Sequence, residues 1–508
     1  MSVMLNSIRQ GTKDSFIYGL GNIAVKIVGF LLIPLYTDPR YFSVDDFGII
    51  AVLDISGLIL ISLMASGLPQ SMMRWYWDKD YSSDRKGIFF MSFSFQILIS
   101  LLFCTFLIPM SGSLSRAIFD TDALSDAIRL LVLSSALQAI NNLINTLMRV
   151  QAKSVLFSTA NLLKLITVLG LTIYLITARG MGIAGIYMAQ VIGNLLFVVF
   201  LSGYSIKNSK PFFDRVLFRS MGRFGYPLLL ANFASAVLTA IDRYALNSMA
   251  LLKFVAIYTM AWKIASVLKL VIVDSIKMAL TPMVLKKMNT TDNKRFYKKT
   301  MLYSSFVLML GIIAISLFSY EILKVITKSD TFWTAWMVVP VLSLSVFFVN
   351  MRETTSYGLM INRKSRIIGI NVVISAVLNI ALNILLIPIW NITGTAVATL
   401  VTQIVYWRLN YHFSQKEYFI PYEQKKAVVL FLTGAILSFA GLVLNDLNIV
   451  PRLLLKAMCI AAFPFILYTL NFYETAELQA VKGLLRKWSD IRNLGENLRS
   501  LKDTDEEI

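Results

Sequence analysis

Ten charged side chains lie inside long apolar stretches of this sequence. Six are basic and four are acidic: Lys26, Lys164, Arg243, Lys263, Lys269 and Arg352 against Asp54, Asp242, Asp274 and Glu353. Charged groups at membrane depth usually face a protein interior or a wet cavity rather than lipid. The excess of positive charge therefore predicts a cavity that binds an anion. Lysines attract phosphate as point charges, and arginines can bind it through two parallel hydrogen bonds.

The position of each charge within its stretch indicates whether the side chain lines a cavity or reaches out to the membrane surface. Lys26, Lys164 and Lys263 lie roughly nine or more residues from either end, too deep to reach the membrane surface easily, so we expect them to line a cavity. Arg243 is nearer an end and can extend outward instead. Three acids are candidates either for binding a coupling ion or for pairing with a cation: Asp54, Asp242 and Glu353. A pair between Asp54 and Lys26 is one hypothesis.

Neutral polar residues recur on single helical faces in the same stretches. One series follows spacings of three, four and three residues: Asn232, Ser235, Thr239 and Asp242. Asn379 and Asn383 are four residues apart in another stretch. Such a stripe can line a cavity or can join helices by hydrogen bonds, and the sequence leaves both interpretations open.

The apolar stretches fill most of the chain. Of its 508 residues, 57% are hydrophobic and 15% are charged, and the mean hydropathy is +0.68. A membrane-spanning helix needs about 20 mostly apolar residues. The sequence therefore predicts an all-α integral membrane protein with about fourteen transmembrane helices, near 15–37, 46–68, 87–109, 128–148, 155–178, 182–206, 224–247, 254–276, 300–320, 335–360, 367–388, 392–411, 427–445 and 453–472.

The loops between these spans predict their orientation. Lysine and arginine are concentrated in loops 207–223, 277–299 and 361–366, which all fall on one side. Basic loops stay on the cytoplasmic side, so we expect both termini to be cytoplasmic and loop 110–126 to face outward. The net charge of +19 follows from these loops. A nucleic-acid partner would need a basic soluble domain, and the sequence has none.

The two halves of the chain resemble each other at an offset of about 207–211 positions. Lys153-Ser154 matches Lys364-Ser365, for example. We therefore expect an N-terminal lobe of six spans (1–206), a C-terminal lobe of six spans (207–423), two extra spans (424–472) and a tail (473–508). The tail has apolar residues every three to four positions with basic residues between them, a pattern typical of an amphipathic helix on the cytoplasmic leaflet or of a packed cap.

Several kinds of chemistry are excluded by what the sequence contains. It has two cysteines and one histidine, His412, so a metal site or a histidine-dependent triad is not expected. No glycine-rich phosphate-binding loop is present, so the chain is not expected to hydrolyse a nucleotide itself. No cofactor is expected. A glycan polymerase would need large outer loops, and an acyltransferase would need a histidine within the membrane. The protein is therefore not expected to be an enzyme.

Several motifs are similar to those of a known family. The first two spans carry Ile33-Pro34-Leu35-Tyr36-Thr37, Phe42-Ser43, Asp46-Phe47-Gly48, and Gly67-Leu68-Pro69 followed by Arg74. Later spans carry Gly225-Tyr226-Pro227, Asp242-Arg243-Tyr244, Ile257-Tyr258, Asn379, Asn383, Pro388, Gly394, Ala396, Ala398 and Thr399. Over nearly its whole length the chain resembles the Wzx-type polysaccharide (O-antigen) flippases of the MOP (multidrug/oligosaccharidyl-lipid/polysaccharide) exporter superfamily. It departs from them at Ala256, where the family usually has glycine.

The resemblance implies a two-lobed, V-shaped transporter that works by alternating access. Its implied substrate is an undecaprenyl-diphosphate-linked oligosaccharide, flipped from the cytoplasmic to the periplasmic leaflet for O-antigen, lipopolysaccharide or capsule assembly. A glycan polymerase and a chain-length regulator are candidate partners, beside membrane lipids. The residues expected to hold the diphosphate are Lys26, Arg74, Lys164, Arg243, Lys263, Lys269 and Arg352. A cation-coupled multidrug exporter and a lipid II flippase of the same superfamily remain alternatives.

Overall fold

The protein is built from helices, as the hydropathy of the sequence predicts. The computed structural model describes residues 29–81, 83–278, 283–284, 293–362, 364–475 and 477–479. No strand occurs within these residues. The prediction of an all-α membrane protein is confirmed for this part of the chain.

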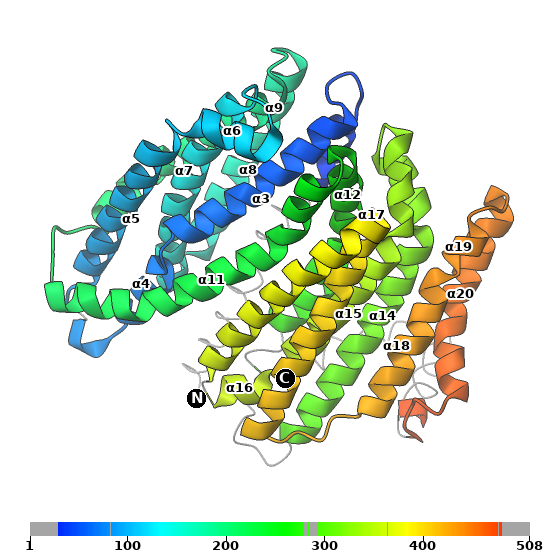
Figure 1. Cartoon of the computed structure of the whole chain (residues 1–508). Coiled ribbons are helices and arrows are strands. Elements are labelled where there is room, and N and C mark those ends of the chain that lie inside the picture. Colours follow the sequence, from blue (N-terminus) through cyan, green and yellow to red (C-terminus); the bar gives the residue numbers. More distant parts are fainter. Residues whose placement is uncertain are drawn as a thin grey trace, which may run out of the picture.

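The helices before residue 210 form one bundle, coloured blue to teal in Figure 1. Its elements are α2 (Ile33–Tyr36), α3 (Val44–Met64), α4 (Leu68–Tyr76), η1 (Lys79–Tyr81), α5 (Arg85–Leu107), α6 (Ser111–Phe119), α7 (Ser125–Val150), α8 (Ser154–Thr177), α9 (Gly182–Phe200) and α10 (Ser202–Lys207). We call it the N-terminal bundle.

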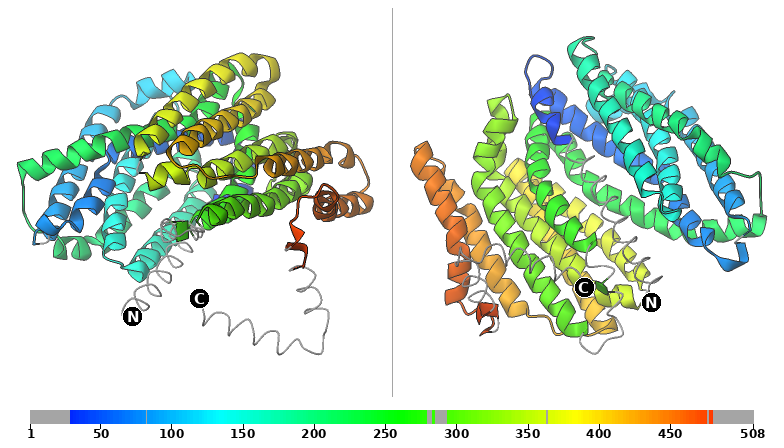
Figure 2. Two further views of the ribbon diagram at one scale, coloured as in Figure 1. Left: turned by 90° about the horizontal axis from the view of Figure 1, so that it is seen from below. Right: turned by 180° about the vertical axis from the view of Figure 1, so that it is seen from behind.

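A second bundle, green to yellow in Figure 1, lies beside the first. It consists of α12 (Leu252–Leu268), η2 (Lys269–Asp274), α14 (Asn293–Ile326), η3 (Asp330–Met337), α15 (Val339–Thr355), α16 (Tyr357–Ile361) and α17 (Ser365–Glu417). We call it the C-terminal bundle. The last helices, α18 (Gln424–Phe439), α19 (Gly441–Leu444) and α20 (Ile449–Thr469), lie on its outer side, away from the N-terminal bundle (Figures 1 and 2).

One long helix, α11 (Arg215–Met249), passes from one bundle to the other (Figure 1). Its first part packs on α4, where Ser71 Oγ donates a hydrogen bond to the Met221 carbonyl at 3.0 Å. Its last part packs in the C-terminal bundle, where the side chain of Asn383 donates to that of Asp242 at 3.1 Å. The bundles therefore share this helix.

Breaks in two helices follow from residues that adopt a left-handed backbone. Between α3 and α4, Gly67 has a φ of +70°, and a Cβ at this position would lie 2.3 Å from the Gly225 carbonyl oxygen of α11. Within α17, Asn391 has a φ of 47° and separates two helices. They run side by side as the two yellow helices of Figure 1, which explains how one element of 53 residues covers two expected spans.

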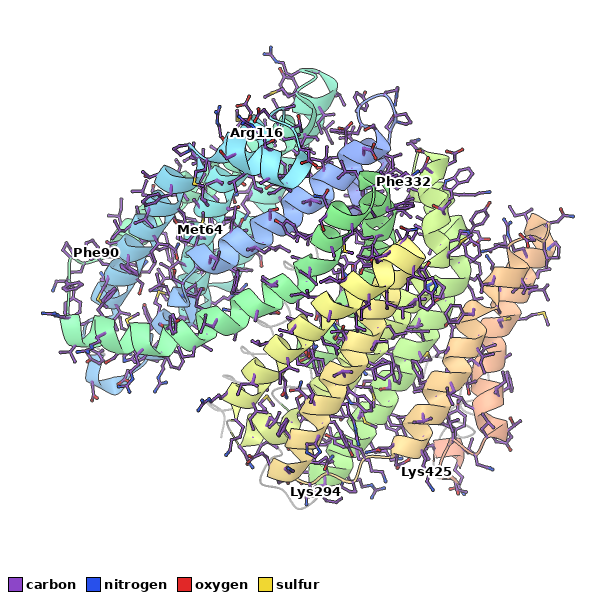
Figure 3. The ribbon with its side chains drawn as sticks, in the orientation of Figure 1. Met64, Phe90, Arg116, Lys294, Phe332 and Lys425 are labelled. Atoms are coloured by element: carbon purple, nitrogen blue, oxygen red, sulfur yellow. The ribbon has the colours of Figure 1, made fainter. Side chains whose placement is uncertain are left out.

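The two bundles contact each other near the beginning of α3. The rings of Phe47 and Phe332, the latter labelled in Figure 3, pack edge to face with centroids 5.1 Å apart. A Cβ at Gly48 would lie 2.4 Å from the Leu252 carbonyl oxygen, so only glycine permits this approach. The bundles diverge toward their other ends, which gives the molecule a V shape (Figure 1).

Within the described residues the structure contains fewer separate helices that could span a membrane than the fourteen expected. Eleven helices are long and apolar enough to cross a membrane, or twelve if the pair η3 and α15–α16, bent by 51°, is one span. The count of fourteen stays a prediction, because most of the first expected span (15–37) lies outside the described residues. So does the tail beyond residue 479.

Candidate functional site

Asp54 and Lys263 lie where the N-terminal bundle meets the C-terminal bundle. Asp54 of α3 is exposed although it sits in the middle of an apolar helix, and its carboxylate accepts a hydrogen bond from the Tyr187 hydroxyl at 3.1 Å. Lys263 of α12 lies within electrostatic range of Asp54. The Lys263 ammonium is 5.2 Å from the ring centroid of Phe47. The hypothesis that Asp54 pairs with Lys26 stays untested, because Lys26 is outside the described residues.

Arg243 is buried in the C-terminal bundle. Only 1% of the residue is exposed, so the alternative that its side chain extends outward is wrong. Its guanidinium lies over the rings of Trp262 and Tyr258, at 4.5 and 5.2 Å from their centroids, and donates to the Thr239 carbonyl. The Nε group has no hydrogen-bond partner. Such a buried cation keeps the capacity to bind an anion.

Asp242 is held in a network of neutral donors. Its carboxylate accepts hydrogen bonds from Tyr258 at 2.5 Å, from Thr399 at 2.8 Å and from Asn383 at 3.1 Å. These donors come from α12 and from both halves of α17, so the carboxylate of α11 ties three helices together. Within the described residues no ion pair joins Asp242 to a cation. The network explains why the asparagine and threonine of α17 face inward.

Arg352 and Glu353 line a cavity of about 470 Å³ in the C-terminal bundle. Glu353 pairs with Lys277 at 2.7 Å and with Arg352 at 3.1 Å. The Arg352 guanidinium also lies 4.2 Å from the centroid of the Tyr406 ring. Two cations therefore share one carboxylate. The other walls combine polar side chains, namely Ser235, Asn350, Thr354, Ser356 and Asn410, with apolar ones, namely Val273, Ile276, Leu359, Met360 and Ile368. This cavity has the size and the charge to receive an anionic group.

Lys277 is a member of this site that the sequence analysis missed. It was assigned to the basic loop 277–299, but the helix that begins with α12 continues to Met278. The π-helical turn η2 lies between the end of α12 and Met278. It begins at Lys269, another of the predicted cations, which is exposed. π-helical turns are frequent at functional sites. The absence of glycine and proline between Ala265 and Met278 was the signal for a longer helix.

Two of the predicted cations lie apart from these groups. Lys164 of α8 donates to the Gln138 side chain at 3.1 Å, and its ammonium is 5.2 Å from the ring centroid of Phe197. Gln138 is neutral, so it does not balance the charge of Lys164. Arg74 is exposed at the contact between α4 and α11, between the rings of Trp75 and Phe224. Lys263 and Arg243 lie within electrostatic range of each other, whereas Arg352 with Lys277, Lys164 and Arg74 lie elsewhere, so the described cations do not form one cluster.

Family and structural comparisons agree with this architecture. A model described as "Polysaccharide biosynthesis protein" matches residues 12–288, more than half of the chain. The chain belongs to this family. Comparison with curated protein sequences finds no significant match.

Several solved structures of transporters and flippases have the same fold. The lipid II flippase MurJ in an inward closed conformation has a TM-score of 0.68 and 16% identity, over 90% of this chain and 100% of the other. An inward-facing MATE family multidrug transporter has a TM-score of 0.62 and 15% identity, over 78% and 97%. A MOP superfamily transporter from Pyrococcus furiosus has a TM-score of 0.58 and 16% identity, over 79% and 94%. The chain therefore has the fold that these three structures share, which is the fold that the sequence predicted.

Proposed function

We propose that this protein flips a polyprenyl-diphosphate-linked oligosaccharide, such as an O-antigen or capsule repeat unit, from the cytoplasmic to the periplasmic leaflet. The family model supports a role in polysaccharide biosynthesis, and the MOP fold supports transport rather than catalysis. In this proposal the protein lies in a bacterial inner membrane with both termini in the cytoplasm. A glycan polymerase and a chain-length regulator act on the product.

The observation that carries the proposal is that, within the described residues, Arg243 and Lys164 lie in the interior without an ion pair to a carboxylate. Arg243 is buried with an unpartnered Nε, Lys164 is bonded to a neutral amide, and Glu353 is shared by two cations. Burying uncompensated charge is costly, so these groups gain most when an anion enters. The diphosphate of a lipid-linked glycan is such an anion.

A multidrug exporter for cationic drugs would need carboxylates free to bind them. Asp242 is instead occupied by three hydrogen-bond donors, and Asp54 lies within range of Lys263. The interior is therefore better suited to an anion than to a cationic drug. A lipid II flippase shares the chemistry of the diphosphate, and only the glycan distinguishes it from our proposal.

The V shape supports a mechanism of alternating access. The diphosphate would enter between the diverging ends of the bundles, meet Arg352 and Lys277, and pass toward Lys263 and Arg243, while the polyprenyl tail stays in lipid. Two negative charges that cross the full field toward the outside would gain about 4–5 kcal/mol per 100 mV. Asp242, Asp54 and Glu353 remain candidates for a coupling ion, and Asp242 is the most deeply enclosed of them.

The experiment that tests the proposal measures the sidedness of the lipid-linked glycan in cells depleted of this protein. The glycan is labelled from the periplasmic face with a reagent that does not cross the membrane. We expect the glycan to accumulate but to stay protected from the reagent, and re-expression of the protein to restore labelling. Labelling at the normal rate in depleted cells would contradict the proposal. Accumulation of lipid II instead of a polymer precursor would favour the lipid II alternative.

A further inference from the structure

A second cavity lies at the end of the N-terminal bundle, away from the candidate site. It has a volume of about 310 Å³ and is enclosed by the turn between α4 and α5, the first turn of α5 and segment 208–212. Phe90, in the second turn of α5, marks this end of the bundle in Figure 3. None of the residues that line this cavity lines the larger cavity around Arg352.

The lining of this cavity is basic. Arg85, Lys86 and Lys210 contribute three positive charges, and Asp84, whose carboxylate accepts the Ser83 hydroxyl at 3.0 Å, contributes one negative charge. Within the part of the chain that the structure describes, no ion pair includes any of the three cations. The Arg85 guanidinium lies 4.2 Å from the ring centroid of Trp77, and its Nε has no hydrogen-bond partner. The lining therefore carries a net positive charge, because three cations face a single carboxylate that pairs with none of them.

The walls of the cavity are fixed by packing and hydrogen bonds. The Lys210 N–H donates to the Lys86 carbonyl at 3.3 Å. Phe212 packs on Gly87, where a Cβ would lie 2.6 Å from the Phe212 Cβ. The side-chain amide nitrogen of Gln151 donates to the Tyr76 hydroxyl at 2.7 Å and to the side-chain oxygen Oδ1 of Asn208 at 2.9 Å. These contacts hold segment 208–212 against α5, so Lys210 stays near the other two cations.

Aromatic side chains beside the cavity indicate where it lies in the membrane. Trp77 is 55% exposed and Phe213 is 69% exposed. Tryptophan gathers at the level of the lipid headgroups, and basic loops lie on the cytoplasmic side. A pocket for a soluble anion would not need apolar rings at its edge, whereas a lipid presents a phosphate beside its acyl chains. Basic pockets at this level bind anionic lipid headgroups.

We propose that the cavity formed by Arg85, Lys86 and Lys210 binds the phosphate headgroup of an anionic glycerophospholipid from the cytoplasmic leaflet. The phosphate accepts hydrogen bonds from the arginine and the two lysines. Lys210 belongs to the segment that leads into α11, the helix shared by the two bundles. A bound headgroup therefore joins this segment to α5 and stabilises the protein. The proposal does not depend on which substrate the protein transports.

The test is a lipid titration of the delipidated full-length protein, followed by native mass spectrometry. The probes are phosphatidylglycerol, zwitterionic phosphatidylethanolamine and soluble glycerol 3-phosphate. The variant R85Q/K86Q/K210Q removes the three cations of the cavity. The matched control R215Q/R219Q/R223Q removes three charges from exposed positions at the beginning of α11, outside the cavity.

We expect phosphatidylglycerol to bind the wild type and the control with the same affinity at one saturable site. In the cavity variant that affinity falls about a hundredfold, since each cation near an anionic lipid contributes on the order of fivefold. If the triple variant does not fold, K210Q alone tests the proposal, because Lys210 is exposed, and we expect about a fivefold loss.

Three results would overturn the proposal. The first is equal binding of phosphatidylglycerol by the wild type and the cavity variants. The second is an equal loss of affinity in the control, which would mean that general surface charge attracts the lipid. The third is competition by glycerol 3-phosphate at the concentration that saturates phosphatidylglycerol, which would identify a site for a soluble phosphate.

Discussion

The hydroxyl groups of Ser56 and Tyr244 are 2.6 Å apart and form a hydrogen bond between α3 and α11. Ser56 also donates to the Val52 carbonyl at 2.7 Å, so Tyr244 is the donor to Ser56. A second bond at the same contact of the bundles joins the Asn247 side chain to the Ile118 carbonyl. Both bonds must break if the bundles separate at this end.

The substitution Y244F removes the first of these bonds and keeps the ring. A single hydrogen bond contributes about 1 kcal/mol. We therefore expect the population of molecules in which the bundles are separated at this contact to rise about fivefold. Spin labels at Ala123 and Thr334, both exposed, would report the change as longer distances between them. Y226F, at an exposed tyrosine of the same helix, is the control. An unchanged distance distribution in Y244F would show that this bond does not hold the bundles closed.

A charge swap separates two roles of Lys263. If Lys263 only pairs with Asp54, K263D/D54K should restore the transport that K263E abolishes. If Lys263 binds the diphosphate, the swap should fold and reach normal levels without restoring transport, and this is the result we expect. The measurement is labelling of the glycan at the periplasmic face. K253E, at an exposed lysine in the first turn of α12, is the matched control and should transport normally.

Arg352 offers a direct test of substrate binding. R352Q removes a guanidinium from the cavity of about 470 Å³, and R408Q removes one from an exposed position of α17 outside it. Hydrogen bonds to charged groups contribute about 1.5–3 kcal/mol, so we expect R352Q to weaken binding of undecaprenyl diphosphate about tenfold to a hundredfold. Equal affinities of the two variants would remove Arg352 from the site.

The sequence predicts the helices and the charged interior better than it predicts which charges meet. Apolar stretches of about 20 residues mark the spans, because the bilayer imposes that length. The partner of Asp54 depends instead on how α3 packs against α12, and Lys263 lies more than 200 positions away. Periodicity within one helix carries no information about such a contact.

The positions of two lysines differ from what the sequence predicts, and both differences have local causes. The sequence places Lys277 in a loop, because the hydropathy falls before the helix ends. The sequence does not single out Lys456, because this residue lies in the first turn of the last expected span, where a lysine usually reaches water. In the structure it is fully buried, and its ammonium is 2.7 Å from a carboxylate oxygen of Glu321 and 2.6 Å from the Asn445 side chain. The asparagine stripe of α17, in contrast, was expected to join helices or line a cavity, and Asn383 does bond to Asp242.

Glu321 should be essential for the attachment of α20 to the C-terminal bundle. Its carboxylate pairs with Lys456 and also with Arg452, at 2.9 Å. E321Q would leave both cations without their carboxylate, and breaking a buried pair costs about 3–5 kcal/mol. We expect a marked fall in the thermal unfolding midpoint in detergent. E417Q, which removes the more exposed pair with Lys364, should change it little, since such pairs contribute about 0–1 kcal/mol.

The beginning of the C-terminal tail should detach from the bundle in acid. Burial alone would raise the pKa of Glu477. The hydrogen bonds from Lys299 and Tyr303 outweigh burial and lower this pKa to about 2. Glu474 also pairs with Lys299, at 2.7 Å, and lies 3.9 Å from Lys426. The pKa of Glu477 is lower in the folded protein than its unfolded value of about 4.3. Its contribution to the stability of the folded state is therefore complete above a pH of about 4.3 and is lost as the pH falls toward 2.

A spin label at Gln479 would measure this detachment. We expect the label to be immobilised at pH 7 and to become mobile as the pH falls from about 5 to about 2, since protonation removes the ion pair in that interval. E477Q should make the label more mobile at pH 7 and should weaken the pH dependence. E417Q keeps the Glu477 pair intact and should follow the wild type. A label that stays immobilised at pH 2, or an E477Q profile identical to the wild type, would show that packing rather than this ion pair holds the segment.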